Sequence, residues 1–534
     1  MRVLAKVALL TLVVSCATAP KPAPPGPVEV QILAINDFHG ALEPTPLPDT
    51  RRGGGAALLA ARVSALRQPN SIFVSAGDLV GGSPLPSGLF HDEGAIEVMN
   101  AMGLQLAAVG NHELDEGPDE LLRLQRGGCH PQDGCQVSQP FPGAKFEFLA
   151  ANTTVRATGK TLFSPRAVRS VGGISLGFIG LTLKDTPRAT VAEMVKDLDF
   201  GDEVEATNAL VPGLLAEGAQ AVVVVIHQGG FQGEYGKGEV DGCENFVGPI
   251  KVMTPKFHPA VAAVISGHTH SFYNCVVDGR PVTSAGARGQ ALTDLRLRFD
   301  AQGTFVGASA KNTLVDASVP ADARVAALVE TYLAKARPIG NKQIGTLTAP
   351  LDRKGSPGGD SALGNVVADA MLAAAKGPPS NADLALMNTS GLRADLAAGP
   401  VSYAQAFEVQ PFGNTLITVA VTGAELEQML EASVGAKGKH LEVGGLTFEW
   451  NAAAPPGERI DPKDVSVGGK PLVLEKTYRA ITNSILSDAV SGYAALGARR
   501  DAVSGPPDLD AFSAWLTKNP NLAPPPQRVQ VKGK

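Results

Sequence analysis

Short apolar runs alternate with amphipathic stretches through the first half of the chain. Continuous runs rich in Val, Ile and Leu are typical of strands buried on both faces. We expect such strands at residues 28–35, 71–75, 104–109, 146–151, 174–180, 221–226 and 261–266. Residues 292–299 alternate apolar and polar positions, which predicts a half-exposed strand. Residues 53–67 and 95–102 have helical spacing. Helices between apolar strands predict an α/β core in which helices cover a sheet.

A second α/β pattern follows in the other half. We expect a helix over 321–336, which Arg337-Pro338 should end because proline lacks an amide proton. Further helices and strands are predicted at 362–375, 382–387, 416–421, 423–432 and 478–482. A domain boundary is therefore expected near 338–342. The predicted organisation is a first domain over 28–320, a linker helix over 321–340 and a second domain over 341–530.

The N-terminus has the pattern of an export signal. Two basic residues precede the apolar run 7–14, which is too short to span a bilayer but suits the core of a signal peptide over 1–15. Residues 13–16 resemble a bacterial lipobox, in which Cys16 would be lipidated after cleavage. The alternative is an ordinary signal peptide that ends near a cysteine. Residues 16–27 are Pro-rich and predict an extended tether. We expect a lipid anchor to membrane in the bacterial cell envelope, facing the periplasm or the cell surface.

Composition excludes several functional classes. The chain has 534 residues, of which 44% are hydrophobic, so wholesale disorder is excluded. The 46 basic and 52 acidic residues give a net charge of −6, and no basic run stands out. Binding to a nucleic-acid polymer needs a basic surface and is not expected. We expect a monomer.

The cysteine count agrees with export. If Cys16 carries lipid, four cysteines remain, an even number that fits an oxidising compartment. Cys129 and Cys135 bracket a polar loop with a glycine turn and can close it. Cys243 and Cys275 then pair by elimination. A cysteine metal site is the alternative, although neither pair has zinc-finger spacing.

Polar motifs directly follow five of the predicted strands. The motifs are Asp37-Phe38-His39, Gly77-Asp78, Gly110-Asn111-His112-Glu113, His227 and Gly267-His268-Thr269-His270. Loops at the carboxyl ends of such strands are where α/β sheets bind ligands. In an extended segment, the spacing of Asp37 and His39, and of His268 and His270, puts both side chains on one face. Any one motif is more often a simple turn, but all five in this order are difficult to attribute to chance.

The residue types in these motifs suit transition metals. Asp, Asn and His favour Mn, Zn, Co or Fe over Ca. Two divalent metal ions bridged by a carboxylate can clamp an attacking and a leaving oxygen, and can supply hydroxide near neutral pH. This is the chemistry of phosphoester hydrolysis by metal-activated hydroxide, so we expect the partner to be a small-molecule phosphoester. Four other histidines lie in turn-rich segments and receive no role: His91, His130, His258 and His440.

The order of the motifs resembles that of the calcineurin-like metallophosphoesterases. Residues 36–40, 75–84, 110–115 and 266–270 more closely resemble the 5′-nucleotidase family, which includes periplasmic UDP-sugar hydrolases/5′-nucleotidases. Residues 284–299 resemble the strand pair that closes the catalytic domain of that family, and 362–371, 385–393 and 410–416 resemble its C-terminal domain. The resemblance implies a four-layer α/β/β/α metallophosphoesterase domain followed by a smaller α/β 5′-nucleotidase C-terminal domain.

The resemblance also implies roles for individual residues. One metal ion would take Asp37, His39, Asp78 and His270. The other would take Asp78, Asn111, His227 and His268, which makes Asp78 the bridging carboxylate. His112 matches a histidine that stabilises the transition state at the phosphoryl group, and Asp115 matches the carboxylate that orients it.

The second half departs from the family pattern. In the family an Asn-Gly-Gly-Gly-x-Arg loop holds the substrate, and two aromatic rings sandwich the base. Here Asn388, Gly391 and Arg393 are kept as substrate-binding residues, while Thr389 and Ser390 replace glycines. Phe412 matches one of the two rings.

The remaining positions of the substrate site differ more. Ile485 stands near the position of the second ring, and Ser491 near that of an expected Asp. An arginine expected just before the motif 362–365 is absent from residues 356–360. We therefore expect weak preference among bases, with hydrolysis retained.

Three functions compete at this point. The first is an exported dimetal phosphoesterase acting on nucleotides, of the 5′-nucleotidase or nucleotide-diphosphate hydrolase type. The second keeps the metal chemistry but changes the substrate, as in a thiosulfohydrolase or a general phosphodiesterase; Asn388, Arg393 and Phe412 argue against it. The third is a lipoprotein that binds a ligand without turnover, which the complete set of ligands together with His112 and Asp115 disfavours.

Overall fold

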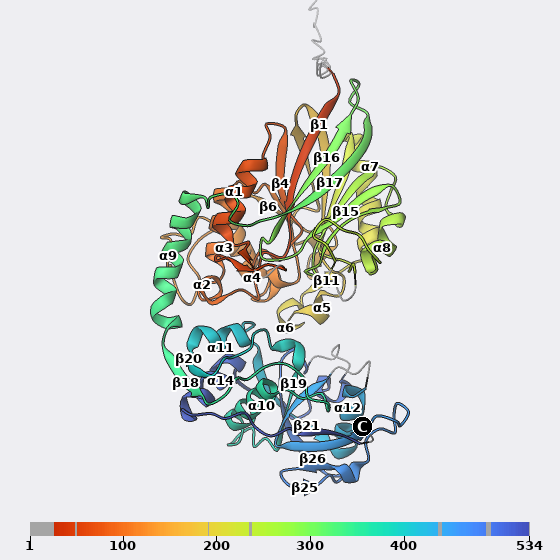
Figure 1. Cartoon of the computed structure of the whole chain (residues 1–534). Coiled ribbons are helices and arrows are strands. Elements are labelled where there is room, and N and C mark those ends of the chain that lie inside the picture. The colour runs from red at the N-terminus through yellow and green to blue at the C-terminus, as the bar shows by residue number, and fades with distance from the viewer. Residues whose placement is uncertain are drawn as a thin grey trace, which may run out of the picture.

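A computed structural model describes residues 26–532, apart from 49–50, 191, 234–237, 436–439 and 488–492. The predicted signal peptide, Cys16 and Ser491 lie outside the described residues. Within the described part of the chain, no helix is both long and apolar enough to cross a membrane. The chain forms two domains joined by one long helix (Figure 1).

The first domain contains two six-stranded sheets. One sheet has the order β17-β16-β1-β4-β5-β6, in which β1, β4, β5 and β6 run parallel and β16 and β17 antiparallel to their neighbours. Its strands are β1 (Val28–Ile35), β4 (Ser71–Ser75), β5 (Leu106–Ala108), β6 (Glu147–Leu149), β16 (Ala291–Phe299) and β17 (Phe305–Leu314).

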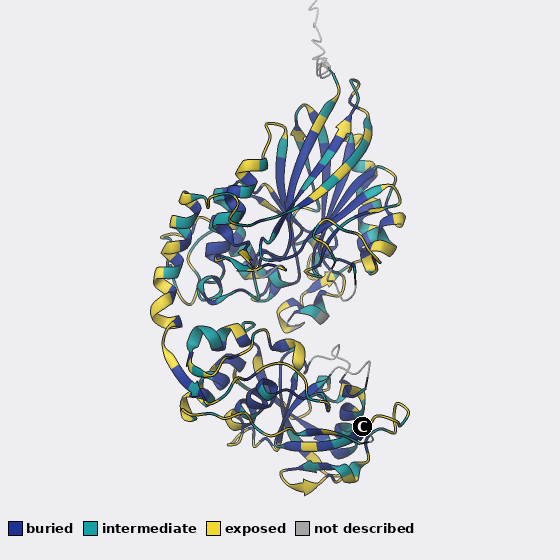
Figure 2. Cartoon of the chain, in the orientation of Figure 1, coloured by how far each residue is buried: buried dark blue, intermediate teal, exposed yellow. Residues whose placement is uncertain are grey.

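The other sheet has the order β14-β15-β13-β12-β10-β9. Its strands are β9 (Arg166–Val171), β10 (Ile174–Leu181), β12 (Ala221–Ile226), β13 (Val261–Ser266), β14 (Phe272–Val277) and β15 (Arg280–Ala285). The four inner strands, β15, β13, β12 and β10, are parallel, and the two edge strands are antiparallel to their neighbours. Every residue of β12 and β13 is buried, as their unbroken apolar sequences predict (Figure 2).

Three apolar clusters hold these sheets and their helices together. Ile32 and Val74 of the first sheet meet Phe178 and Val223 of the second in the core between the sheets. Three helices cover the outer face of the first sheet: α1 (Ala56–Leu66), α3 (Glu93–Met102) and α4 (Pro118–Arg126). Two cover the second: α7 (Glu203–Ala216) and α8 (Pro249–Met253). The result is the expected four-layer α/β/β/α fold.

Two expectations about local structure were wrong. The helix α9 (Ala323–Gly340) continues through Pro338. Proline there lies in the last turn, where its missing amide proton costs a single hydrogen bond, and the turn is closed by Asn341 N–H donating to Arg337 O. Residues 284–299 do not form one strand pair, because Ser284 belongs to β15 in one sheet and 291–299 form β16 in the other. This segment carries the chain between the sheets.

The second domain is built on a five-stranded sheet of order β22-β19-β26-β21-β27. Its strands are β19 (Leu384–Asn388), β21 (Thr415–Thr422), β22 (Leu441–Gly444), β26 (Thr477–Asn483) and β27 (Val503–Pro507). The helices α10 (Ala362–Ala374), α11 (Tyr403–Val409) and α14 (Asp508–Lys518) pack on one face. The helices α12 (Gly423–Ser433) and α13 (Ala494–Gly497) pack on the other. A small sheet contains β23 (Leu446–Asn451), β24 (Val465–Val467), β25 (Lys470–Pro471) and β28 (Val529–Lys532).

Candidate metal centre and active site

The side chains predicted to bind metal lie together at the carboxyl ends of strands from both sheets. Asp37 and His39 follow β1, Asp78 follows β4 and Asn111 comes soon after β5. The remaining three come from the second sheet: His227 follows β12, and His268 and His270 follow β13. Because the two sheets face each other, their strand ends deliver side chains to one point.

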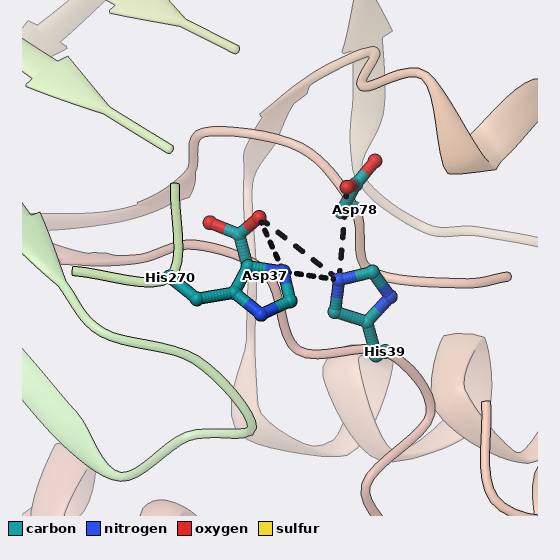
Figure 3. A group of neighbouring side chains, drawn as sticks. All are labelled: Asp37, His39, Asp78 and His270. Atoms are coloured by element: carbon teal, nitrogen blue, oxygen red, sulfur yellow. Dashed lines mark hydrogen bonds and ion pairs between the residues drawn. The ribbon is translucent and has the colours of Figure 1, made fainter. Parts of the chain in front are cut away.

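One group contains Asp37, His39, Asp78 and His270, whose possible ligand atoms all lie within 4.8 Å of one another (Figure 3). His39 Nε2 lies 3.0 Å from His270 Nε2 and 3.6 Å from Asp78 Oδ2. His270 Nε2 lies 3.4 Å from Asp37 Oδ1. Donor atoms that share one ion at about 2.1 Å are separated by about 3–3.5 Å, so these spacings fit a common metal ion.

A second group shares Asp78 with the first. His227 Nε2 lies 3.0 Å from Asp78 Oδ2 and 3.1 Å from Asn111 Oδ1. His268 Nδ1 lies 3.1 Å from the same Asn111 oxygen. The other Asp78 oxygen, Oδ1, accepts the backbone N–H of His112. Oδ2 of Asp78 is therefore the atom that faces both groups.

Hydrogen bonds behind these side chains aim the correct atoms at the two groups. His39 Nδ1–H donates to Gly81 O at 2.7 Å, and His227 Nδ1–H donates to Ala76 O at 2.8 Å. In both rings Nε2 is then the atom that can bind a metal ion. The Asn111 amide nitrogen donates to Ala189 O at 3.0 Å, which turns Oδ1 towards the centre. Such outer hydrogen bonds orient metal ligands, and the donor set fits two divalent ions.

The charges of the ligand-free centre are also suited to metal binding. Burial lowers the pKa of His39 to about 3 and of His268 to about 4, so both rings are neutral at pH 7. Burial lowers the pKa of His227 too, but the carboxylate of Asp78 outweighs it and raises that pKa to about 10. Ligation by His227 would therefore release a proton.

The ligands do not lie on extended segments, contrary to our expectation. Left-handed backbone angles occur at Asp37 (φ 50°), His39 (φ 46°), Asp78 (φ 51°), His268 (φ 72°) and His270 (φ 53°). Side chains converge because the chain turns sharply after each strand, whereas alternation along a strand plays no part. Such conformations cost about 1–3 kcal/mol each and cluster at functional sites.

Glu113 lies in the motif 110–113, and its contacts give it a structural role that the sequence did not indicate. Its buried carboxylate accepts the backbone N–H groups of Asp78 at 2.8 Å, Leu79 at 2.6 Å and Gly110 at 2.6 Å. Burial, with the nearby charge of Asp78, raises the pKa of Glu113 to about 8. Glu113 thus ties the loops after β4 and β5 together. In the sequence, its position beside Asn111 and His112 was the feature that could have indicated this role.

His112 and Asp115 form a hydrogen-bonded pair beside the metal centre. His112 Nδ1 lies 2.6 Å from Asp115 Oδ2, and the Thr190 hydroxyl donates to Asp115 Oδ1 at 2.7 Å. Burial lowers the pKa of His112, but Asp115 and Asp78 outweigh this effect and raise it to about 9. The ring of His112 lies 5.1 Å from that of His39, between centroids. Thr190 is a contributor that the sequence did not indicate.

A pocket of about 220 Å³ joins the two domains next to this pair. The first domain contributes His112, Asp115 and Thr190. The second contributes all four predicted substrate-binding residues and Ile485, so its lining includes Asn388, Gly391, Arg393, Phe412 and Ile485. The ring of Phe412 stacks on His112 with centroids 5.7 Å apart, and Arg393 lies over Phe412 at 5.5 Å.

Two further features frame this pocket. A Cβ on Gly82 would lie 3.1 Å from Phe412 Cε1, so glycine there permits the close approach of the domains. Residues 356–360, which lack the expected arginine, are not part of the pocket lining. There, Gly358 O accepts a hydrogen bond from the Trp450 indole N–H, and the buried Asp360 accepts one from the Asn365 amide.

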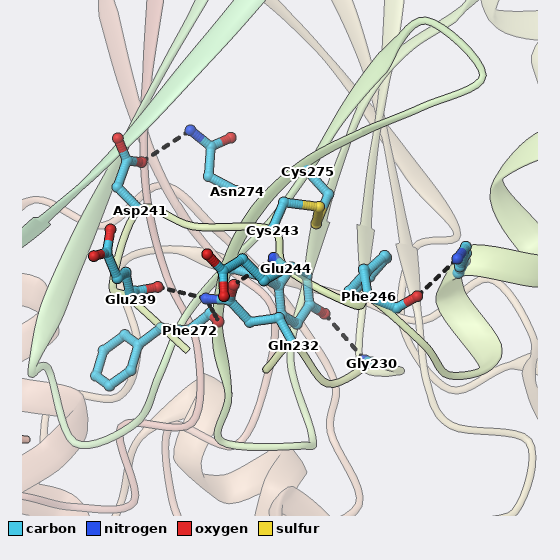
Figure 4. The surroundings of a disulfide bond; sticks show 12 residues. Gly230, Gln232, Glu239, Asp241, Cys243, Glu244, Phe246, Phe272, Asn274 and Cys275 are labelled. Carbon is cyan, nitrogen blue, oxygen red and sulfur yellow. Dashed lines mark hydrogen bonds between the residues drawn. A yellow bond between two sulfur atoms is a disulfide. The ribbon is translucent and has the colours of Figure 1, made fainter. Parts of the chain in front are cut away.

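Both predicted disulfides are present. Cys129 and Cys135 are joined with Cα atoms 4.5 Å apart, and Cys243 and Cys275 with Cα atoms 5.1 Å apart. The second bond attaches the loop that contains Cys243 to the edge strand β14 (Figure 4). Gln232 braces the same loop, because its amide donates to Phe272 O and accepts from Glu244 N–H.

Comparison with known proteins divides the chain as the fold does. The family profile described as calcineurin-like phosphoesterase matches residues 30–272. The profile described as 5′-nucleotidase, C-terminal domain, matches residues 343–498.

Individual relatives cover both halves. The chain is 29% identical over 510 residues to endonuclease YhcR of Bacillus subtilis, covering 92% of this chain but 40% of that protein, so it spans less than half of that relative. It is 26% identical over 553 residues to the 5′-nucleotidase of Bos taurus, covering 93% of this chain and 90% of that protein. The crystal structure of a 5′-nucleotidase precursor from Thermus thermophilus superposes with a TM-score of 0.73 at 25% identity, covering 95% of this chain and 100% of that one. Both halves match in the same order, and the chain therefore belongs to the 5′-nucleotidase family of calcineurin-like metallophosphoesterases, which are metal-dependent phosphoric ester hydrolases.

Proposed function

We propose that this chain hydrolyses nucleoside 5′-phosphates and related nucleotide diphosphates outside the cytoplasm. The observation that carries the proposal is the pocket shared by the domains. It brings His112 and Asp115 of the phosphoesterase domain next to Asn388, Arg393 and Phe412 of the C-terminal domain. A phosphoryl group at the metal centre and a base against Phe412 would occupy neighbouring positions.

The residues of the chain have separable roles in this proposal. Asp37, His39, Asp78 and His270 would hold one divalent ion, and Asp78, Asn111, His227 and His268 the other. When bound, such ions activate water and neutralise charge on phosphoryl oxygens.

The remaining polar groups of the site act on the phosphoryl group and the leaving oxygen. His112, held by Asp115, places an N–H beside the phosphoryl group, where negative charge develops. The planar guanidinium of Arg393 can donate two parallel hydrogen bonds to phosphoryl oxygens. Asn388 and Gly391 line the same pocket, where they would contact the leaving nucleoside.

Preference among bases is proposed to be weak. Base stacking on an aromatic face contributes about 1–3 kcal/mol, and this pocket offers one such face, that of Phe412. Ile485 also lines the pocket and can give apolar contact without stacking. The two disulfides support an oxidising compartment. Cleavage before Cys16 and its lipidation remain part of the proposal.

A substrate panel tests the function. Purified full-length protein is assayed with AMP, UDP-glucose, bis(p-nitrophenyl) phosphate and a sulfate ester, with Mn²⁺ added and with chelator. We expect metal-dependent release of phosphate from AMP or cleavage of UDP-glucose, abolished by chelator. Cleavage of the sulfate ester alone would favour the thiosulfohydrolase alternative. Tight nucleotide binding without any turnover would favour a binding lipoprotein, and either result would overturn the proposal.

A further inference from the structure

A second cavity, of about 330 Å³, opens on the other side of Arg393. Gly40 and Gly82, which neighbour the metal ligand His39, form part of its wall. Arg288 of the first domain and Arg393 of the second both line it. Arg393 also lines the pocket that contains Phe412. The two arginines therefore line one cavity, which adjoins the first pocket at Arg393.

Two acidic residues, Glu43 and Glu408, line the same cavity as these arginines. Within the described ranges, no ion pair joins Arg288 or Arg393 to any carboxylate. The charge of Glu408, which lines the same cavity, raises the pKa of Arg288, although the two side chains form no ion pair. Burial lowers the pKa of both arginines, and the charge of Arg288 lowers that of Arg393 further. Three arginines against two glutamates leave the cavity lining with a net positive charge, which favours an anion.

The backbone holds Arg288 firmly in this place. Its N–H donates to Asp37 O at 2.7 Å, and its carbonyl accepts from Gly55 N–H at 3.0 Å. Its φ of 55° is left-handed, a conformation that favours glycine. An arginine here adopts a conformation against its preference, with its backbone hydrogen-bonded to that of a proposed metal ligand, and such positions cluster at functional sites.

We propose that Arg288 and Arg393 form an anion clamp across the domain interface, which binds a phosphoryl dianion at the edge of the metal centre. The clamp rests on the proposed function, since the anion it holds would be a phosphoryl group of the substrate or the phosphate product. Two planar guanidinium groups offer paired donors to a tetrahedral dianion, and its two charges match theirs. Arg288 is thus a substrate-binding residue supplied by the catalytic domain, whereas Arg393 comes from the other domain.

Binding of inorganic phosphate to the Mn²⁺-loaded, full-length protein tests the clamp by calorimetry. Arg288→Gly removes the guanidinium and relaxes the left-handed backbone, so the thermal midpoint should be unchanged or raised. Phosphate affinity should fall about 10- to 100-fold, the loss expected for charge-assisted hydrogen bonds. Arg288→Lys should recover part of it. Arg52→Ala is the matched control, because Arg52 lines the same cavity and its loss removes the same charge; its effect should stay within about threefold.

The double variant Arg288→Gly/Arg393→Ala separates a shared clamp from two independent sites. If both arginines hold one anion, the combined loss is smaller than the product of the single losses. Phosphate affinity of Arg288→Gly within twofold of the parent, or an equal loss in Arg52→Ala, would overturn the clamp. These binding measurements need no turnover. Failure of the clamp with AMP hydrolysis intact would leave the proposed function standing, and the reverse result would reject the function alone.

Discussion

At the scale of single residues, Asp78 has the largest expected effect, because its Oδ2 faces both ligand groups. We predict that Asp78→Asn lowers the content of both metal ions and removes most of the turnover, since an amide oxygen carries no full charge with which to bridge two cations. Metal analysis together with initial rates measures this. Asp115→Asn, outside both groups, is the control and should keep its metal. Near-normal turnover and metal content in Asp78→Asn would contradict the two-metal assignment.

Two neighbouring residues should separate metal binding from charge stabilisation. We predict that His112→Ala keeps both metal ions but loses rate by roughly 10²–10⁴, the range for a positioned donor at developing charge. Asn111→Ala should lose metal, because its oxygen faces His227 and His268. Metal content measured beside the rate distinguishes the two variants. Equal metal loss in both would show that His112 supports the centre structurally.

At the scale of elements, the two disulfides restrain loops that strand pairing does not hold in place. Cys243–Cys275 spans 32 residues and Cys129–Cys135 spans 6. In the chain-entropy account the longer loop contributes about 4 kcal/mol and the shorter about 2 kcal/mol. We predict that replacing Cys243 and Cys275 by Ser destabilises the first domain more than replacing the other pair. Urea unfolding followed by far-UV circular dichroism measures the difference. A larger loss from the six-residue loop would contradict the prediction.

The loop closed by Cys129 and Cys135 is also held by charge. His91 Nε2 lies 2.8 Å from Asp133 in that loop, and Nδ1 lies 2.9 Å from Glu116. Burial lowers the pKa of His91, but Glu116 and Asp133 outweigh it and raise the pKa to about 9. Because the pKa of His91 is higher in the folded state than in the unfolded state, its charge stabilises the fold fully below about pH 6.5. This stabilisation is lost as the pH rises through about 9.

A pH series tests this charge effect. We predict that His91→Gln lowers the thermal midpoint most at pH 6, with a difference from the parent that shrinks towards pH 10. His258→Gln, outside the cluster, provides the control and should show no such trend. A difference that stays constant from pH 6 to pH 10 would show that the charge of His91 contributes nothing.

At the scale of the whole molecule, the active site depends on how the domains meet. Phe412 reaches from the second domain to stack on His112 of the first. We predict that Phe412→Ala raises KM for AMP more than KM for a base-free phosphoester, because only AMP has a base to stack. KM values for AMP, GMP, CMP and UMP in the parent should fall within about one order of magnitude. Strong discrimination between adenine and uracil nucleotides would mean that the base site has been rebuilt around Ile485.

The sequence by itself indicated which residues are candidates to bind metal, and it determined where most of the strands lie. Both depend on local information: residue chemistry, and the period of apolar positions along a few residues. Asp78 or His227 after an apolar strand is visible without any knowledge of the fold. The same local reasoning went wrong at Pro338, because the cost of proline depends on how much helix follows it.

Only the tertiary structure decided how these residues meet. Three features depend on contacts between segments remote in sequence. They are the left-handed turns at Asp37 and His270, the three backbone amides that donate to Glu113, and the placement of Arg288 and Arg393 on one cavity. Such contacts follow from the packing of two sheets and two domains, and no short-range pattern encodes them. Sequence therefore gives the ligand types, whereas the convergence of strand ends and the docking of the domains give the geometry in which those ligands can act.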